Sequence, residues 1–373
     1  MKNKKLFWVW VVTAFLIPVL LICGTITKPH IFVAGTTIKA AEINSDFDTL
    51  YNEFNGEIES VNIKDGTIVN ADITDLTIAD GKIIGLDGSK ITDATITGAK
   101  MAAGIINRGA TLIVAASDSL SSAGADYVCD GTSDEVEIES AIADLPSGGG
   151  RVLLMEGTYN ISDTIDFASY DYITLEGQGF STILYLIDSA DDDVIVANQY
   201  YNQIKNLVID GNKDNQSTNK TGITLNPGSN FNVIENCYIK NIRGDGIRSL
   251  GADITIKDCF FYTITRHGIT CENSENFIRN NYFYNIISYA INMTAGAGKS
   301  LINDNYIESG YSIYIASDNN LVTGNRLYSA SSTALHADTT ADTNCFAGNA
   351  IFNGGSMTND GTNTDTTSVN FNF

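Results

Sequence analysis

Proline and basic residues are both scarce in this chain. Only four of its 373 residues are proline, against 33 glycines, which excludes a proline-rich linker and leaves tight turns to glycine. Lysine and arginine number 22 against 44 acidic residues, giving a net charge of -22. Without a basic surface to displace counterions from phosphates, nucleic acid is excluded as a partner. The acidity instead favours solubility, divalent cations or a neutral partner.

Long apolar runs are limited to the beginning of the chain. Lys2, Lys4 and Lys5 precede an uncharged stretch at 6–22, which is 17 residues long and contains Pro18. A membrane-spanning helix needs about 20 apolar residues. We therefore predict that residues 1–28 are a secretory signal peptide, with a membrane anchor, uncleaved or lipidated, as the alternative.

Cysteine is present in an odd number once a signal peptide is removed. An odd number leaves at least one thiol unpaired or available between chains. Cys237 and Cys259 fall in equivalent repeat positions, so their Cα atoms would lie close enough for a disulfide. The favoured interpretation is that both are small buried hydrophobic residues. The five remaining cysteines are Cys129, Cys237, Cys259, Cys271 and Cys345.

A six-residue motif recurs through the second half of the chain. Its copies after residue 234 are separated by 22, 22, 24, 20 and 24 residues. That period suits one turn of a right-handed parallel β-helix, whose turns stack at the roughly 4.8 Å spacing of paired strands. The copies are IKNLVI at 204, IENCYI at 234, IKDCFF at 256, IRNNYF at 278, INDNYI at 302, VTGNRL at 322 and FAGNAI at 346.

The positions within the motif predict which side chains face inward. The first and sixth are apolar in every copy and should be buried, while the second carries mixed charges and should face outward. The fourth changes from apolar residues to asparagine, and stacked asparagines can satisfy bent backbone by hydrogen bonds from turn to turn. We predict a structural ladder at the fourth position: Leu207, Cys237, Cys259, Asn281, Asn305, Asn325 and Asn349.

Two segments before the repeats indicate a stalk. In 29–61, Phe47, Phe54 and Val61 recur every seven residues, which predicts a helical oligomerisation collar. In 62–110, isoleucines recur every five residues, which fits either a pentapeptide solenoid or, as preferred here, an intertwined trimeric β-shaft. The tail at 354–373 is a polar linker ending in an alternating strand, which closes the last turn or, less favoured, pairs with a neighbouring subunit.

Two stretches resemble known families. The sequence GTTIKAAEINSDFDTLYNEFNG at 35–56, with the isoleucine repeats, resembles the stalks of phage tail fibres and related bacterial surface proteins, which implies trimeric attachment. Residues 125–167, ADYVCDGTSDEVEIESAIADLPSGGGRVLLMEGTYNISDTIDF, resemble the start of the pectate-lyase-like β-helix superfamily. That resemblance implies an all-β fold at 111–353, with a short helix capping the first turn of a right-handed parallel β-helix.

The residues themselves support the capping helix. Asp134 and Glu137 have the spacing of a capping box at a helix start. Pro146 and the following glycines end the helix before the first strands. Its expected apolar face consists of Ile138, Ala141, Ile142 and Leu145.

Aligning the repeats brings two candidate catalytic residues together. Asp245 and His267 occupy equivalent positions 22 residues apart, as does Tyr289 one turn later. An acid beside a histidine can donate and accept protons on a glycan. The alternative is that these residues form turn-to-strand junctions, where the polar side chain faces solvent. The glycan-binding residues predicted around the pair are Arg243, Arg248, Arg266 and Tyr289.

A polar loop and an acidic run are the other candidate sites. Asp210 and Asn212 begin the loop and are predicted to bind ligand, while Asp214 is a candidate ligand for Ca²⁺. The alternative is a solvated turn. The acidic run adds Asp191, Asp192 and Asp193 as candidate calcium ligands, and no other cofactor is predicted.

Tyrosine is abundant in the repeats and offers a surface for sugars. Tyrosines on an outer sheet can stack against sugar rings, although tyrosine is also favoured in strands and in the core. The tyrosines in question are Tyr200, Tyr201, Tyr262, Tyr282, Tyr284, Tyr289, Tyr306, Tyr311 and Tyr314.

Two function classes fit these features. The first is a secreted, extracellular or cell-surface fibre, appendage or adhesin subunit that self-associates as a homotrimer or filament and contacts surface glycans. The second is a stalk-tethered polysaccharide lyase or glycoside hydrolase. The sequence favours the first, because stalk signals are plentiful and catalytic ones sparse.

Overall fold

The computed structural model describes residues 110–329, 333–353, 355–362, 364 and 371–372, together with 41, 43–45, 47–48 and 51. The chain divides into two units, Met1–Thr95 and Ile96–Phe373, which are treated separately. In the first unit the described residues are helical, and they lie within the predicted collar. The predicted signal segment and nearly all of the β-shaft lie outside the described residues. No described helix combines the length and hydropathy needed to span a bilayer.

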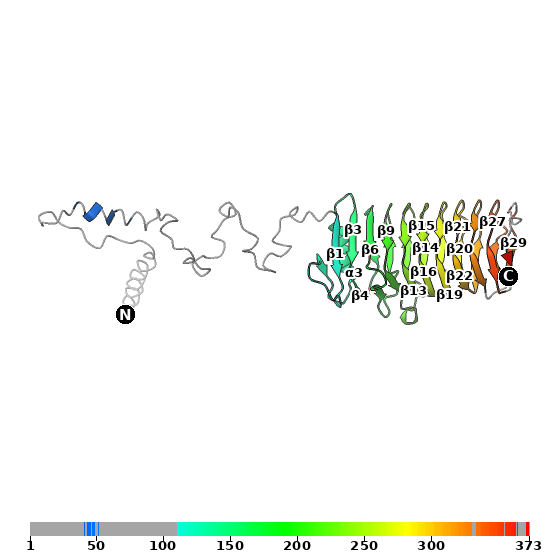
Figure 1. Ribbon diagram of the computed structural model, residues 1–373, viewed down its shortest axis with the longest axis horizontal. Coiled ribbons are helices and arrows are strands. Elements are labelled where there is room, and N and C mark those ends of the chain that lie inside the picture. The colour runs from blue at the N-terminus through cyan, green and yellow to red at the C-terminus, as the bar shows by residue number, and fades with distance from the viewer. Residues whose placement is uncertain are drawn as a thin grey trace, which may run out of the picture. The chain divides into compact units, whose positions relative to one another are not determined.

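The second unit is an all-β parallel solenoid, as predicted. Its strands form three parallel sheets, and each turn of the chain, here called a coil, adds one strand to each sheet (Figure 1). The coils succeed one another in sequence order, so each strand pairs with its counterparts in the preceding and following coils. The buried apolar side chains form one continuous core inside the three sheets.

Sheet 1 has eleven strands: β2(Tyr127–Val128), β1(Thr111–Ala115), β3(Gly150–Leu154), β6(Ile173–Glu176), β9(Gln203–Lys205), β12(Val233–Glu235), β15(Thr255–Lys257), β18(Phe277–Arg279), β21(Leu301–Asn303), β24(Leu321–Thr323) and β27(Cys345–Ala347). Sheet 2 has ten strands: β4(Gly157–Ile161), β7(Thr182–Leu186), β10(Val208–Asp210), β13(Tyr238–Ile242), β16(Phe260–Ile264), β19(Tyr282–Ile286), β22(Tyr306–Ser309), β25(Arg326–Ser329), β28(Ala350–Phe352) and β30(Phe371–Asn372). Sheet 3 has nine strands: β5(Ile165–Asp166), β8(Ile195–Ala197), β11(Ile223–Leu225), β14(Ile247–Ser249), β17(Ile269–Cys271), β20(Tyr289–Met293), β23(Tyr311–Ile315), β26(Thr333–Ala337) and β29(Ser356–Asn359).

The six-residue motif spans the bend between sheet 1 and sheet 2. Its first and sixth residues are buried in every coil, as predicted. Its third residue lies in the left-handed region, with φ between 51° and 69°, which lets the chain turn the corner. Asparagine, aspartate and glycine tolerate that conformation best, and they alone occupy the position. These residues are Asn206, Asn236, Asp258, Asn280, Asp304, Gly324 and Gly348.

The fourth motif position carries a hydrogen-bonded asparagine ladder. The backbone N–H of Asn281 donates to Oδ1 of Asn305 at 3.0 Å, and that of Asn305 donates to Oδ1 of Asn325 at 3.0 Å. Each side-chain amide also donates back to a carbonyl of the preceding coil, as Asn305 Nδ2 does to Ile278 O at 3.0 Å. The ladder therefore satisfies buried backbone groups that the bend would leave unpaired.

A second buried ladder, which the sequence analysis did not identify, stands two residues before the motif. Asn202 N–H donates to Oδ1 of Asn232 at 2.6 Å, and Asn320 N–H donates to Oδ1 of Asn344 at 2.7 Å. It holds the bend into sheet 1 as the first ladder holds the bend out of it. The members are Asn202, Asn232, Asn276, Ser300, Asn320 and Asn344.

The cysteines in the first ladder are not bridged. All five described cysteines are free. Cys237 and Cys259 are buried and their thiols donate to backbone carbonyls, including Sγ of Cys259 to Lys257 O at 3.2 Å. They therefore pack as small side chains within the stack.

Helix α3(Glu135–Ala143) covers the first coil. Its predicted apolar residues Ile138, Ala141, Ile142 and Leu145 are all buried. The predicted capping box was wrong, because no side chain of Asp134 caps the helix. The carboxylate of Asp134 instead accepts backbone N–H groups from Gly131 at 2.9 Å and Asn160 at 2.7 Å, which ties the helix start to β4. At the other end β30 pairs with β28, where the terminal strand was expected to close the last coil.

Candidate functional site

Sheet 3 brings Asp245 and His267 together at the turns that enter β14 and β17. Asp245 is only 1% exposed, and its Oδ1 accepts the backbone N–H of His267 at 3.2 Å. The guanidinium of Arg266 lies 3.6 Å from the same oxygen. The carboxylate of Asp245 is thus buried and stabilises a turn through its hydrogen bond. This geometry fits the alternative interpretation, in which these residues form turn-to-strand junctions.

His267 stacks along the same column on Tyr289. The two rings are 5.9 Å apart and 11° from parallel. Burial lowers the pKa of His267, although the carboxylate of Asp245 works in the opposite direction. The imidazole is therefore neutral at pH 7, and its Nδ1 is buried with no hydrogen-bond partner in the described part of the chain.

The three predicted binding arginines have separate environments. Arg248 Nε pairs with Glu272 Oε1 at 2.6 Å on the outer face of sheet 3. Arg266 pairs with Asp245, and Arg243 reaches the carbonyl of Lys213 at 3.5 Å. They do not form one cationic patch.

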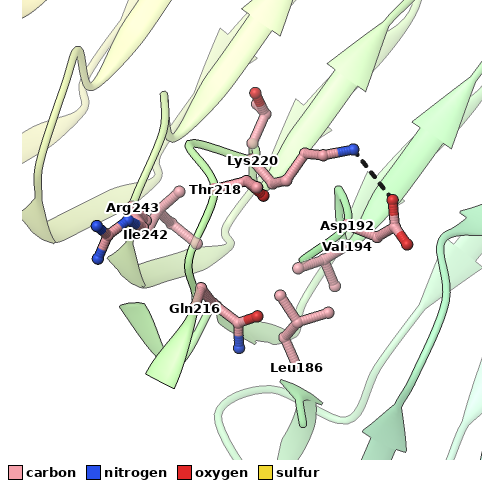
Figure 2. A pocket seen from close by; sticks show the side chains of 10 residues that line it. Leu186, Asp192, Val194, Gln216, Thr218, Lys220, Ile242 and Arg243 are labelled. Carbon is pink, nitrogen blue, oxygen red and sulfur yellow. Dashed lines mark hydrogen bonds and ion pairs between the residues drawn. The ribbon is translucent and has the colours of Figure 1, made fainter. Parts of the chain in front are cut away.

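A small cavity lies where the polar loop after β10 crosses the next coil (Figure 2). Its volume is about 10 Å³, room for one water at most. Lys220 and Asp192 form an ion pair of 3.1 Å at its edge. Nε of Arg243, which lines the cavity, is buried and has no hydrogen-bond partner among the residues that the structure describes. The cavity is too small for a sugar.

The predicted calcium ligands are dispersed among separate protein partners. Hydrogen bonds, the Ser217 hydroxyl first, lower the pKa of Asp191 to about 2. Asp193 accepts from Thr221 N and Thr224 Oγ1, both at 2.7 Å. The other pairs are Asp210 with Lys240 at 3.0 Å, Asp214 with Lys213 at 2.6 Å, and Asn212 with Asp188 at 2.8 Å.

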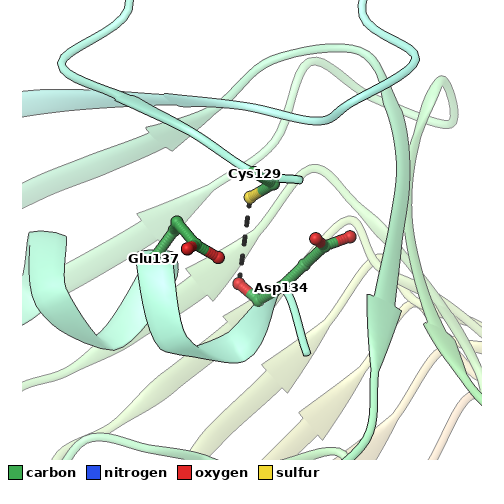
Figure 3. Close-up of side chains that lie close together, drawn as sticks. All are labelled: Cys129, Asp134 and Glu137. Carbon is green, nitrogen blue, oxygen red and sulfur yellow. Dashed lines mark hydrogen bonds between the residues drawn. The ribbon is translucent and has the colours of Figure 1, made fainter. Parts of the chain in front are cut away.

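Among the described residues, one group of three metal-type side chains lies close together: Cys129, Asp134 and Glu137 (Figure 3). Their ligand atoms lie within 4.8 Å of one another, and none was predicted as a metal ligand. Burial raises the pKa of all three groups, which favours their neutral forms. Both carboxylate oxygens of Asp134 already accept hydrogen bonds from backbone N–H groups. Asp134 therefore links the capping helix to the first coil.

Aromatic side chains cover the outer face of sheet 2 in two columns that follow the stacking of the coils. In one, Phe260 and Tyr282 stack at 4.6 Å and 5°, and Tyr282 and Tyr306 at 4.8 Å and 5°. In the other, Tyr262 and Tyr284 stack at 5.6 Å and 7°. Because stacked rings cover one another's faces, a ligand reaches a free face only where a column is interrupted.

The second column is interrupted at Glu308. The register aligns Tyr262, Tyr284, Glu308, Tyr328 and then Phe352 in successive coils. A slot of about 550 Å³ opens at this place. Its lining residues are Tyr262, Tyr284, Asn285, Glu308, Ser309, Gly310, Tyr328 and Asn353.

A shortened turn also widens the slot. Tyr282 and Tyr289 lie seven positions apart, while their partners in the next coil, Tyr306 and Tyr311, lie five apart. Gly310 alone joins β22 to β23, and a Cβ added there would meet no atom closer than 3.8 Å. The turn that is shorter by two residues thus leaves open space beside Glu308.

Sequence reasoning found the tyrosines but missed the slot. The signal was present, because the coil that begins at Ile302 is the shortest, with 20 residues to the next motif. Glu308 also stands directly after the six-residue motif, at a position that is aromatic in the two copies before it and the two after it. In chain order this position reads Asp210, Lys240, Tyr262, Tyr284, Glu308, Tyr328 and Phe352.

Comparisons with known proteins identify the fold. No curated protein matches the chain. Similar solved structures include the A-module of the Azotobacter vinelandii mannuronan C-5 epimerase AlgE6, at 18% identity over 63% of this chain and 76% of that one, with a TM-score of 0.46. ORF18 of Geobacillus virus E2 is 14% identical over 64% of this chain and 57% of that one (TM-score 0.44). An alginate lyase from Paenibacillus sp. str. FPU-7 is 15% identical over 68% and 99% (TM-score 0.44).

The family model described as "Right handed beta helix region" matches residues 192–373. That range begins just before β8 and includes the coils in which the six-residue motif recurs. The match agrees with the coil-by-coil parallel pairing of the three sheets, which shows that the fold of the second unit is a parallel β-helix.

Proposed function

We propose that this chain is a secreted, extracellular or cell-surface fibre-type subunit that self-associates through its stalk and binds carbohydrate with its β-helix. The carbohydrate site is the slot at Glu308 on the outer face of sheet 2. Catalysis is not required for this role. Its cellular partners are then glycans and further copies of the same chain.

The slot between Tyr284 and Tyr328 is the observation that carries the proposal. Tyr284 stacks on Tyr262 at 5.6 Å on one side and has Glu308 as its neighbour on the other. Tyr328 borders the slot, but its ring centre lies 4.3 Å from that of Phe352 and 5.0 Å from that of Tyr306. A pyranose ring presents apolar C–H faces that pack on aromatic rings, and hydroxyls that need polar partners. Asn285, Glu308 and Asn353 supply such partners in the lining of the slot.

Binding of residues 25–373 to a panel of immobilised glycans would test the proposal. Titration calorimetry on a glycan that binds would then compare the wild type with Tyr284→Ala. Losing one stacking face should weaken binding about tenfold. Phe277→Ala is the matched control, because Phe277 is a similarly exposed aromatic residue on sheet 1. An unchanged affinity in Tyr284→Ala would contradict the placement of the site.

A polysaccharide lyase or glycoside hydrolase is the second candidate, because the fold brings Asp245 and His267 within one hydrogen bond of each other. The low exposure of Asp245 argues against it. The test is cleavage of a polysaccharide panel with and without Ca²⁺ by the wild type and by His267→Ala. We expect no cleavage by either protein. Turnover that His267→Ala abolishes would reverse the preference.

A further inference from the structure

The geometry of the slot points to a specific ligand class. We propose that the slot binds a sugar with a protonated amine, a cationic amino sugar, whose ring stacks on the open face of Tyr284 and whose ammonium pairs with Glu308. This inference rests on the proposed carbohydrate-binding function. It adds the charge of the ligand and the orientation of its ring.

The open face of Tyr284 has room for one ring. Tyr284 stacks on Tyr262 at 5.6 Å on one side, and its neighbour in the next coil is Glu308. Tyr328 offers no second stacking face, because its ring centre lies 5.0 Å from that of Tyr306 and 4.3 Å from that of Phe352. A sugar ring on Tyr284 would lie about 5 Å away, within the normal range for stacked rings. The ligand therefore takes the place of the missing aromatic ring beside Tyr284.

The charge of the slot favours a cation. Glu308 is exposed and is the one charged residue in the lining. Burial and then the negative charge of Glu308 raise the pKa of the neighbouring Tyr282, consistent with a carboxylate beside the aromatic columns. Tyrosine faces attract cations as well, so Tyr284 and Glu308 both favour an ammonium group. The net charge of -22 adds a long-range attraction of the same sign.

Arg326 is a positive group that contacts Tyr328 at the border of the slot. Its guanidinium lies 5.6 Å from the Tyr306 ring centre and 6.0 Å from the Tyr328 ring centre. It also donates to the Tyr328 hydroxyl at 3.0 Å, which fixes the orientation of that ring. Arg326 is not part of the slot lining, so Glu308 remains the charge that a ligand meets there.

A pair of ligands that differ in charge would test the inference on the chain at 25–373. The probes are a β-1,4-linked glucosamine tetrasaccharide and its N-acetylated counterpart, titrated at about pH 6, where an ordinary amine is protonated. We expect the cationic ligand to bind at least about tenfold more tightly, as a charged hydrogen bond provides. Glu308→Gln should remove that preference, and added salt should reduce it. Glu275→Gln, a surface carboxylate on the sheet 1 side, should leave it unchanged.

A variant that completes the column separates binding from folding. Glu308→Tyr would cover the open face of Tyr284 with an aromatic ring, so it should raise the melting temperature while abolishing binding of both tetrasaccharides. Retention of binding in this variant would overturn the site.

The outcomes also separate this inference from the proposed function. Equal binding of the two tetrasaccharides, both lost in Glu308→Tyr, would overturn the amino-sugar inference and leave carbohydrate binding at the slot standing. Binding of tetramethylammonium in competition with the cationic tetrasaccharide, with the neutral sugar silent, would show a cation site and overturn the role of the sugar ring. Failure of every glycan on the panel would overturn the proposed function itself.

Discussion

Glu308 occupies a position whose neighbours in the stack are aromatic, and this one residue changes what the surface can do. A tyrosine there would continue the column and cover the second face of Tyr284. Glutamate leaves that face open and places a carboxylate beside it. The neighbouring turn at Gly310 is two residues shorter than its counterpart, so the space is not refilled from the side. A binding site thus arises from a local departure within a regular repeat.

His267 gives a residue-scale prediction about pH. Burial lowers its pKa in the folded protein below the unfolded value of about 6.5. The unfolded state then binds more protons below that value, so the stability is full above about pH 6.5 and is lost as the pH falls. Measured by guanidinium unfolding at about pH 7.5 and about pH 5.5, His267→Gln should lose less stability on acidification than the wild type.

The other described histidine supplies the control for that measurement. His336 lies on the same sheet and has its imidazole 3.1 Å from Asp360. Replacing it in His336→Gln should not reproduce the effect of His267→Gln. Equal pH slopes in the wild type and His267→Gln would show that burial of His267 does not control the acid response.

The bend between sheets 1 and 2 is the element that the repeat specifies most strictly. In each coil, an Asn, Asp or Gly with left-handed backbone is followed directly by the ladder residue. The first residue provides the bent conformation, and the ladder residue provides the hydrogen bonds for the backbone groups at the bend. The ladder also links each coil to the next. A single change should therefore affect partners on both sides.

Asn305→Leu tests the ladder at the element scale. It would leave the backbone N–H and side-chain amide of Asn281 without their acceptor, and Ile278 O without its donor. Each orphaned buried group costs about 1–3 kcal/mol, so the free energy of unfolding should fall by at least about 3 kcal/mol. Denaturant titration measures it. The control is Asn303→Thr, which gives the outer face of β21 the residue that β24 already carries. A loss no larger than that of the control would refute the ladder's energetic role.

Thiol reactivity tests whether the cysteines in the coils are unbridged. Burial raises the pKa of Cys237, and raises that of Cys271 to about 12, so both thiols stay protonated and unreactive. Titration of the chain at 25–373 with a disulfide reagent should label Cys345, which is partly exposed, before the other four. All five should react after unfolding without a reductant. Recovery of only three thiols would reveal a disulfide.

At the scale of the whole molecule, we predict that the stalk sets the assembly state. The heptad positions Phe47, Phe54 and Val61 predict a helical collar, and the described residues of that segment are helical. Sedimentation and electron microscopy of residues 25–373 should therefore give stalked particles of three times the chain mass. Changing Phe47→Asp and Phe54→Asp together should shift the mass to that of one chain, with Ser45→Asp as the charge control. A monomeric wild type would contradict the predicted collar. Long regular filaments would show that the chain assembles into a filament and not into a trimer.

The repeat could be identified from sequence because its period, its buried first and sixth positions and its asparagines are local properties of each copy. The capping helix was also predictable from its apolar face and from the glycines that follow it. The role of Asp134 was not, because the N–H groups that donate to its carboxylate belong to Gly131 and, beyond the helix, to Asn160 of β4. A contact with another strand leaves no trace in the local pattern.

The sequence alone determined the parallel β-helix, because a coil cannot bury its inner face without identical neighbours and the same apolar pattern therefore returns in each copy. Only the tertiary structure decided where the site lies. It showed that the carboxylate of Asp245 is covered by its own turn, that the acidic run is divided among separate partners, and that Tyr284, Glu308 and Tyr328 share one column. The physical reason is that exposure and stacking depend on how successive coils align, and residues 20 to 24 positions apart become neighbours only in the folded stack.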